Sequence, residues 1–209
     1  MIFSPRDAQI LRWINGHGFA TGRQVADWLG VRYQSIHPRL KFLTDAGYLR
    51  SQRVGHNLLA LRLTKAGVTR CGDDLPPLRA IRFGSFFHDL QLIDLATKLT
   101  KQTGGQFTTE RRLRQERGFK GVGLPTHIPD GLLKLDGKPP IAIELELSTK
   151  GWQRLQNILQ AYAADFSLGE VWYFAGNDAL RRRLESAAEG YAFVRVFSFA
   201  EEALSLQTD

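Results

Sequence analysis

Apolar residues recur at helical spacing in two short stretches near the start of the chain, after Ser4 and after Thr21. We expect both residues to cap helices, because a serine or threonine hydroxyl accepts a hydrogen bond from a free backbone N–H of the first turn. The second stretch has the spacing of a capping box from Thr21 to Gln24 and ends at Gly30, a residue type common after the last helical turn.

A third apolar stripe covers residues 35–46, but Pro38 interrupts it. Proline lacks the N–H that an internal helical position donates, whereas the first turn leaves that group without a helical partner in any case. We therefore expect Ser35 to cap the third helix, so that Pro38 falls in its first turn, and Gly47 to end it.

Residues 48–54 and 58–63 flank Gly55-His56-Asn57 and predict a β-hairpin, after which Thr64 caps a short fourth helix. Three helices followed by a basic hairpin are typical of a winged helix-turn-helix domain, whose third helix enters the major groove of DNA. Six cations lie where this docking requires them: Arg32, Arg39, Lys41, Arg50, Arg53 and Arg62. The alternative is a winged helix used for protein contacts.

Residues 72–85 hold two consecutive prolines and two glycines, and we expect a linker there between a DNA-binding domain, residues 1–71, and a second domain, residues 86–209. The second domain is expected to be α/β, so the chain as a whole mixes α/β and α+β features. On its first helix, the side expected to be buried consists of Phe87, Leu90, Ile93, Leu95 and Leu99. Its expected elements are a helix over 86–103, strands over 106–114, 128–135 and 141–147, a helix capped by Ser148, a strand over 170–176, a helix from Asp178, a strand over 192–199 and a short terminal helix.

The strand over 141–147 carries the candidate chemistry. Its apolar residues alternate with Glu144 and Glu146, so both carboxylates project from one face. A strand flanked by helices is usually covered on both faces, and buried carboxylates need a partner or a metal ion. The turn near Lys138 folds the preceding strand back; if the loop is odd in length, Asp130 faces the two glutamates, and this is the register we expect.

Three clustered carboxylates, Asp130, Glu144 and Glu146, form a hard oxygen site for Mg²⁺ or Mn²⁺, which polarises a phosphodiester and activates water. Lys150 is placed to neutralise charge on the phosphate, and Arg154, one helical turn further, to clamp a second phosphate oxygen. The alternative is a solvated edge strand whose glutamates pair with these two cations.

Other charged residues are candidates for the edge of this site. Arg111, Arg112 and Arg114 form either a phosphate track or a solvated segment, two interpretations that the sequence favours equally. Glu110 and His88 are accessory candidates, although a histidine at the start of an apolar helix is more often structural.

The charge distribution favours a polyanionic partner. The 209 residues carry a net charge of +7, but residues 1–82 hold 13 Lys and Arg against 5 Asp and Glu, whereas residues 83–209 hold 15 against 16. Clustered cations gain affinity for a phosphate backbone by releasing its counterions, so the basic N-terminal part predicts double-stranded DNA as the partner. A merely basic surface is the alternative.

Several classes of protein are excluded by simple counts. The sequence has no run of about 18 apolar residues and no signal peptide, so we expect a cytoplasmic protein that does not bind membranes. Its single cysteine, Cys71, excludes an internal disulfide, and the absence of paired zinc-ligand motifs leaves oxygen ligands for any metal.

Three groups of residues resemble known families: residues 10–30 with 40–50, the helix start Phe87-His88-Asp89-Leu90, and Pro129-Asp130-Gly131 followed by Glu144-Leu145-Glu146, Lys150 and Arg154. The last group resembles the PD-(D/E)XK nuclease superfamily, in the variant where Glu146 fills the motif lysine position. The whole chain resembles the replication-relaxation family of mobile elements and the related MobC-type conjugative relaxases, which join a winged helix to a restriction-endonuclease-like domain.

This resemblance implies metal-dependent nicking of plasmid or mobile-element DNA at an origin, in company with relaxosome or replication proteins. It implies metal ligation by Asp130, Glu144 and Glu146, and phosphate contacts by Lys150 and Arg154. Because Leu155 stands where some relatives have a tyrosine, a hydrolytic cut is expected rather than a covalent tyrosyl link. The competing hypothesis is an inactive DNA-binding accessory protein or transcriptional regulator; a homodimer that reads two half-sites is compatible with either.

Overall fold

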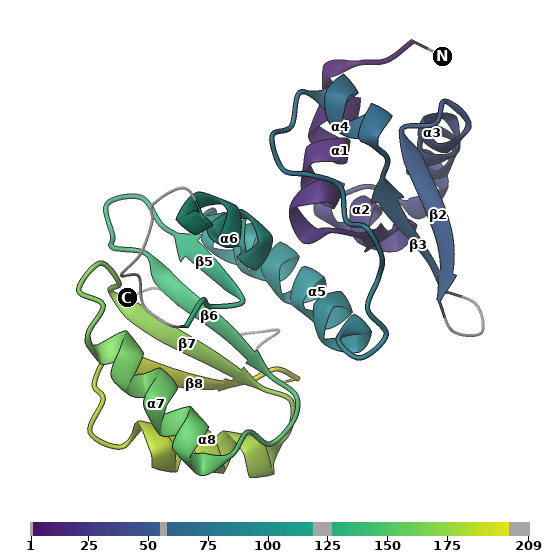
Figure 1. The fold of residues 1–209 in the computed structure, drawn as a ribbon. Helices are drawn as coiled ribbons and strands as arrows, with labels where there is room; N and C mark the ends of the chain where they lie inside the picture. Colours follow the sequence, from purple (N-terminus) through teal and green to yellow (C-terminus); the bar gives the residue numbers. More distant parts are fainter. Residues whose placement is uncertain (1, 55–57, 119–126, 201–209) are drawn as a thin grey trace. The chain divides into compact units, whose positions relative to one another are not determined.

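The computed structural model describes residues 2–54, 58–118 and 127–200, which form two compact units (Figure 1). We name them the N-terminal unit, residues 1–97, and the C-terminal unit, residues 98–209. Each combines helices with a β-sheet, so the expected mixed α/β class is confirmed. No helix among the described residues is long and apolar enough to cross a membrane.

The N-terminal unit contains a three-stranded antiparallel sheet in the order β1-β3-β2. The two longer strands, β2 and β3, form the predicted hairpin, whose expected turn at residues 55–57 lies outside the described residues. In chain order the elements are α1 (Pro5–His17), β1 (Ala20–Thr21), α2 (Gly22–Leu29), α3 (Tyr33–Asp45), β2 (Leu49–Val54), β3 (Leu58–Leu63), α4 (Lys65–Cys71) and the first part of α5 (Phe86–Thr103).

The expected caps of three helices in this unit are confirmed. Ser4 and Asp7 form a capping box at the start of α1, and Thr21 and Gln24 form another at the start of α2. The hydroxyl of Thr64 accepts the backbone N–H of a first-turn residue of α4. Local side-chain chemistry was therefore sufficient to place these three helix starts.

The predicted start of the third helix is wrong. Helix α3 begins at Tyr33, with no side-chain cap, and Pro38 lies inside it rather than in its first turn. Ile36 and Leu40 of this helix are buried in the core of the N-terminal unit. Helix stability in proteins comes mainly from packing of the apolar face, and here this packing outweighs the hydrogen bond that proline cannot donate.

Helix α5 has the predicted bounds, and Ile93, Leu95 and Leu99 of the predicted side are buried, but Phe87 is not. Phe87 is 71% exposed, whereas Phe86 is 3% exposed and stacks on Phe19, with ring centroids 5.3 Å apart. Phe86 shares a second apolar cluster with Val54 of β2 and with Ile81. Residues 72–97 thus pack within the N-terminal unit, which extends beyond the expected domain of residues 1–71.

The C-terminal unit is built on a five-stranded mixed sheet in the order β4-β5-β6-β7-β8. Strand β5 pairs antiparallel with both β4 and β6, whereas β7 pairs parallel with both β6 and β8. After the last part of α5, its elements are β4 (Gln106–Thr109), α6 (Glu110–Gly118), β5 (Gly131–Lys134), β6 (Ile141–Glu146), α7 (Trp152–Ala163), β7 (Glu170–Ala175), α8 (Asp178–Ala188) and β8 (Val194–Ser198).

Two expectations for this unit are wrong. The strand expected over 106–114 ends at Thr109, and the arginine-rich remainder forms α6, because six of its nine residues are arginine or glutamate, which favour a helix. Gly151, not Ser148, precedes the first residue of α7, and no side chain caps that helix. The short terminal helix expected after residue 199 falls almost wholly outside the described residues.

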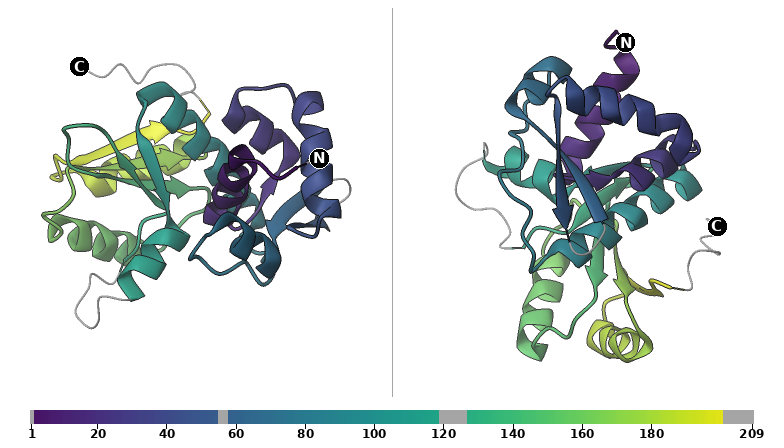
Figure 2. Two further views of the ribbon diagram at one scale, coloured as in Figure 1. Left: turned by 90° about the horizontal axis from the view of Figure 1, so that it is seen from above. Right: turned by 90° about the vertical axis from the view of Figure 1, so that its right-hand side faces the viewer.

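Helices α7 and α8 cover one face of this sheet (Figures 1 and 2). They bury alternate residues of the central strands, among them Ala142, Val171 and Tyr173. All six residues of β6 are buried, so the expectation that this strand is covered on both faces is confirmed. The face under α7 and α8 is the one that carries Glu144 and Glu146.

Candidate functional site

Strand β6 holds two carboxylates inside the protein. Glu144 is 2% exposed and Glu146 is 4% exposed, and both follow Ala142 on the face that α7 and α8 cover. A buried carboxylate is costly unless it has a hydrogen-bond or ionic partner, so the neighbours of these two residues define what the site does.

Strand β5 brings Asp130 beside Glu144. Gly131 pairs with Ile143, so the next pair along the antiparallel register is Asp130 with Glu144. Asp130 Oδ2 accepts the backbone N–H of Leu145 at 2.8 Å. The negative charge of Asp130 adds to the effect of burial in raising the pKa of Glu144. The structure therefore brings together the aspartate and the glutamate that the sequence placed across a hairpin.

Two side chains for which the sequence analysis predicts no catalytic role hold Glu144 in place. Its Oε1 lies 2.6 Å from His127 Nε2 and accepts a short hydrogen bond from the Tyr162 hydroxyl. Burial raises the pKa of Glu144, and the hydrogen bond to His127 opposes that rise. Tyr162 lies on α7 in the core, and burial together with the charge of Glu144 raises the pKa of its hydroxyl. No spacing pattern in the sequence connects these residues.

Lys150 lies between the two glutamates. Its Nζ is 2.6 Å from Glu146 Oε2 and 4.0 Å from Glu144 Oε2. Burial disfavours the charged ammonium, but the charges of Glu144 and Glu146 outweigh this effect and raise the pKa of Lys150. An ammonium thus supplies the positive charge between the two carboxylates.

The ligand atoms that this cluster offers are of the type that a hard divalent cation binds. Asp130, Glu144 and Glu146 offer only oxygen, the ligand that Mg²⁺ and Mn²⁺ prefer. Tyr173, which pairs with Glu144 across β6 and β7, has a buried hydroxyl with no hydrogen-bond partner among the described residues. In the described part of the chain, however, no three His, Cys, Asp or Glu side chains are grouped so that they could hold a metal ion. Binding would require Lys150 to move from between the glutamates.

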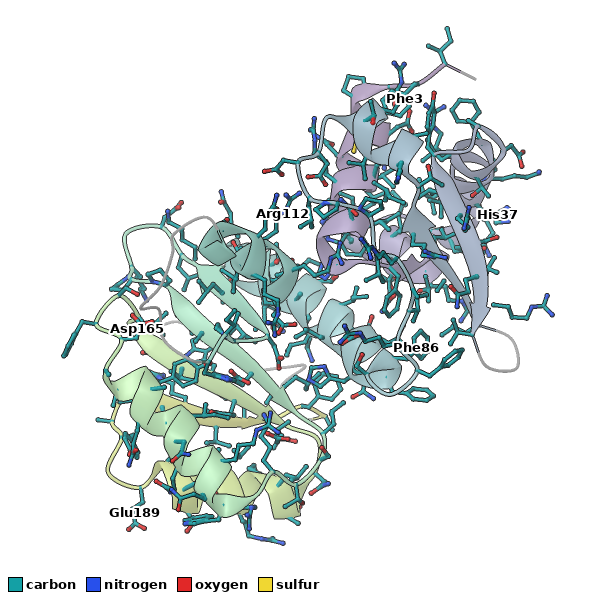
Figure 3. The ribbon with its side chains drawn as sticks, in the orientation of Figure 1. Phe3, His37, Phe86, Arg112, Asp165 and Glu189 are labelled. Carbon is teal, nitrogen blue, oxygen red and sulfur yellow. The ribbon has the colours of Figure 1, made fainter. Side chains whose placement is uncertain are left out.

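The remaining candidates in the C-terminal unit lie on helices. Arg154 is exposed in the first turn of α7. The α6 residues include Arg114, which pairs with Glu110 at 2.5 Å, and Arg112, whose guanidinium contacts Gln115 (Figure 3). Arg111 also lies on α6.

Helix α6 begins next to the carboxylate cluster. The backbone N–H of Glu110 donates to the carbonyl of Asp130 at 3.1 Å. The Glu110 carboxylate itself pairs with an arginine of its own helix rather than with the cluster. His88 belongs to the N-terminal unit and lies 3.5 Å from the carboxylate of Asp89.

Three of the six predicted DNA-contacting cations in the N-terminal unit are engaged within the protein. Arg39 forms a bidentate ion pair with the buried carboxylate of Asp7. Arg62 donates to the backbone carbonyls of Leu78 and Arg79, which joins the hairpin to the segment that follows α4. Lys41 pairs with an aspartate one turn along α3 at 2.8 Å, although both partners are exposed.

The hairpin register separates the other arginines by face. Arg50 pairs with Arg62, and both lie on the face that meets residues 78 and 79. Arg53 pairs with Leu59 on the opposite face, which closer to the base of the hairpin packs into the same core as α3. Arg53 thus projects on the same side of the hairpin as α3, whereas Arg50 does not.

The outer surface of α3 presents polar and cationic side chains. The buried stripe faces the core, and the opposite side is exposed over most of the helix (Figure 3). The exposed residues include Arg32 at the helix start, Gln34, Ser35, His37 and Lys41. These are donors and acceptors of the kind that read base edges and phosphates in a major groove.

Comparisons with protein-family models, with curated proteins and with solved structures found no match for this chain.

Proposed function

We propose that this chain is a DNA-binding protein that cuts one strand of plasmid or mobile-element DNA with the help of Mg²⁺ or Mn²⁺. In this proposal the N-terminal unit is a winged helix and the C-terminal unit is a PD-(D/E)XK-like nuclease. One observation carries it: Asp130, Glu144, Glu146 and Lys150 converge on one face of a sheet although they come from the residue before β5, from β6 and from the loop after β6.

Asp130, Glu144 and Glu146 are the residues that would hold the metal. The ion would polarise a phosphodiester and lower the pKa of a bound water. Lys150 would then turn from Glu146 towards the phosphate, and Arg154 at the start of α7 would contact a second phosphate oxygen. The buried Tyr162 and the partly buried His127 fix the orientation of Glu144 throughout.

DNA recognition is assigned to the exposed side of α3 and to Arg53. The polar side chains of α3 would face base edges, and Arg53 on the hairpin would contact the phosphate backbone. The net positive charge of residues 1–82 supports this assignment, because it lowers the free energy of any phosphate contact made by this unit.

A second function, DNA binding without catalysis, is favoured by a different observation. Glu144 and Glu146 already have protein partners, and the described residues hold no ready-made metal group. If Lys150 stays between the glutamates, the cluster is a buried ion pair that stabilises the fold, and the protein acts as an accessory factor or transcriptional regulator.

Conversion of supercoiled plasmid to open circles in Mg²⁺ or Mn²⁺ distinguishes the two functions. We expect the parent to nick, and Asp130→Asn and Glu146→Gln to lose about a hundredfold of the rate, because losing even a group that orients a metal ligand costs about 10–100-fold. Glu189→Gln, an exposed glutamate outside the cluster, is the matched control and should nick like the parent. Absence of nicking by the parent, with duplex binding intact, would leave only the accessory function.

A further inference from the structure

Trp152 differs from the other three tryptophans in its exposure. It is the first residue of α7 and is 45% exposed. Trp13 and Trp28 stack on each other with ring centroids 4.8 Å apart, and Trp172 is 6% exposed. Tryptophan combines a large apolar face with an N–H donor, so an exposed indole offers both a stacking surface and a polar edge to a ligand.

Arg183 of α8 packs against one face of the Trp152 indole. The guanidinium carbon of Arg183 lies 5.3 Å from the centroid of the Trp152 ring, a cation–π distance. The same guanidinium donates to the backbone carbonyl of Lys150 at 3.1 Å. The ring is therefore ordered before any ligand arrives, which reduces the entropy lost on binding.

The surroundings of Trp152 are cationic. Arg183 contacts the ring, and Arg154 is exposed in the same first turn of α7. Lys150, two residues before the ring, is paired with Glu146. The first turn of α7 contains no acidic residue and has no side-chain cap. An aromatic ring flanked by cations complements a nucleic-acid strand, whose bases stack on the ring while its phosphates meet the positive charges.

We propose that Trp152 is a stacking platform for a base in an unpaired stretch of DNA, with Lys150 and Arg154 beside the phosphates of the same strand. This inference rests on the proposed function and adds its substrate class, since bases inside a duplex are already stacked and do not offer a free face. The carboxylate cluster, which Lys150 joins to this platform, would then act on DNA that has been locally opened.

The test measures binding of a fluorescently labelled oligo(dT) to the full chain in EDTA, by anisotropy. Trp152→Ala should weaken binding about tenfold, and Trp152→Phe should restore most of the affinity because an aromatic face remains. Phe166→Ala is the matched control, because Phe166 is 96% exposed in the same unit but is absent from the cationic platform. Thermal melting of each variant establishes that it is folded.

Intrinsic fluorescence supplies a second readout in the parent protein. Oligo(dT) should quench the tryptophan emission of the parent, and Trp152→Phe should lose most of this quenching although the other three tryptophans remain. Unchanged affinity in Trp152→Ala, or equal quenching in Trp152→Phe and the parent, would overturn the platform. Because EDTA removes the metal, this result is independent of cleavage: stacking without nicking would refute the proposed nuclease and leave the platform standing.

Discussion

Arg39 shows that a cation on a candidate DNA-binding helix can be part of a structural ion pair within the protein. Arg39 belongs to a helix whose exposed face suits DNA, and its position alone made it a candidate contact. Asp7, however, is 1% exposed and pairs with both sides of the Arg39 guanidinium. The bidentate pair lowers the pKa of Asp7 despite its burial, so the carboxylate is charged at neutral pH. The pair fixes α1 against α3.

Removing Arg39 should therefore destabilise the N-terminal unit rather than act first on DNA. Arg39→Ala leaves a buried aspartate charge without its partner, which costs about 3 kcal/mol. Urea denaturation would measure this loss, and Arg32→Ala, at an exposed position next to the same helix, should stay within about 0.5 kcal/mol of the parent. Equal stability of Arg39→Ala and the parent would show that Asp7 finds another partner.

The residue scale also shows how much of the candidate site was predictable. The alternation in β6 and the two-carboxylate spacing predicted a shared face for Glu144 and Glu146, because a strand has a period of two. Tyr162 and His127 were not predictable in this role, since the packing of α7 and the approach of residue 127 depend on contacts distant in sequence. Asp130 required a register that only the pairing of β5 with β6 fixes.

At the scale of elements, two capping boxes predicted helix starts correctly, whereas two other expectations from local sequence were wrong. The capping boxes placed α1 and α2, but Pro38 misplaced the start of α3, and the strand expected over 106–114 hid α6. The two failures have different causes. In α3, packing of the apolar face outweighed the local effect of proline. In α6, the helix preference of arginine and glutamate prevailed over the expected strand.

The pairing of β4 with β5 depends on a glycine. A Cβ atom on Gly131 would lie 2.1 Å from the Phe107 ring, which covers it from the neighbouring strand. Gly131→Ala should lower the free energy of unfolding by about 1–3 kcal/mol, because the ring must shift within a packed core. Gly84→Ala is the control, since a Cβ there meets nothing within 4 Å. Calorimetric melting would compare them, and equal melting temperatures would contradict the packing of Phe107 on Gly131.

The two faces of the β2–β3 hairpin offer a sharper test of DNA docking. Arg53→Ala should weaken duplex binding and reduce the slope of log K against log salt by about one, the effect of one lost phosphate contact. Arg50→Ala, with the same chemistry on the opposite face, should leave the slope unchanged. Anisotropy titrations at several salt concentrations would measure both. Equal losses in the two variants would mean that the hairpin faces are not distinguished by DNA.

At the scale of the whole molecule, the two compact units differ in the chemistry of their charged residues. The basic excess lies in residues 1–82, and the carboxylate cluster lies in the C-terminal unit. The sequence predicted two domains, but not that residues 72–97 pack within the first. A segment rich in proline and glycine has the composition of a linker whether or not it packs against a domain.

If the units divide binding and cutting, single substitutions should separate the two activities in the intact chain. Glu146→Gln should bind duplex DNA in EDTA as tightly as the parent, yet fail to nick it when Mn²⁺ is added. Arg53→Ala should show the reverse: weaker binding, but a nicking rate at saturating protein equal to that of the parent, because it acts on association and not on the reacting phosphate. Nicking rates measured as a function of protein concentration resolve the two effects. A lower maximal rate in Arg53→Ala would show instead that docking by the N-terminal unit also positions the strand at the carboxylates.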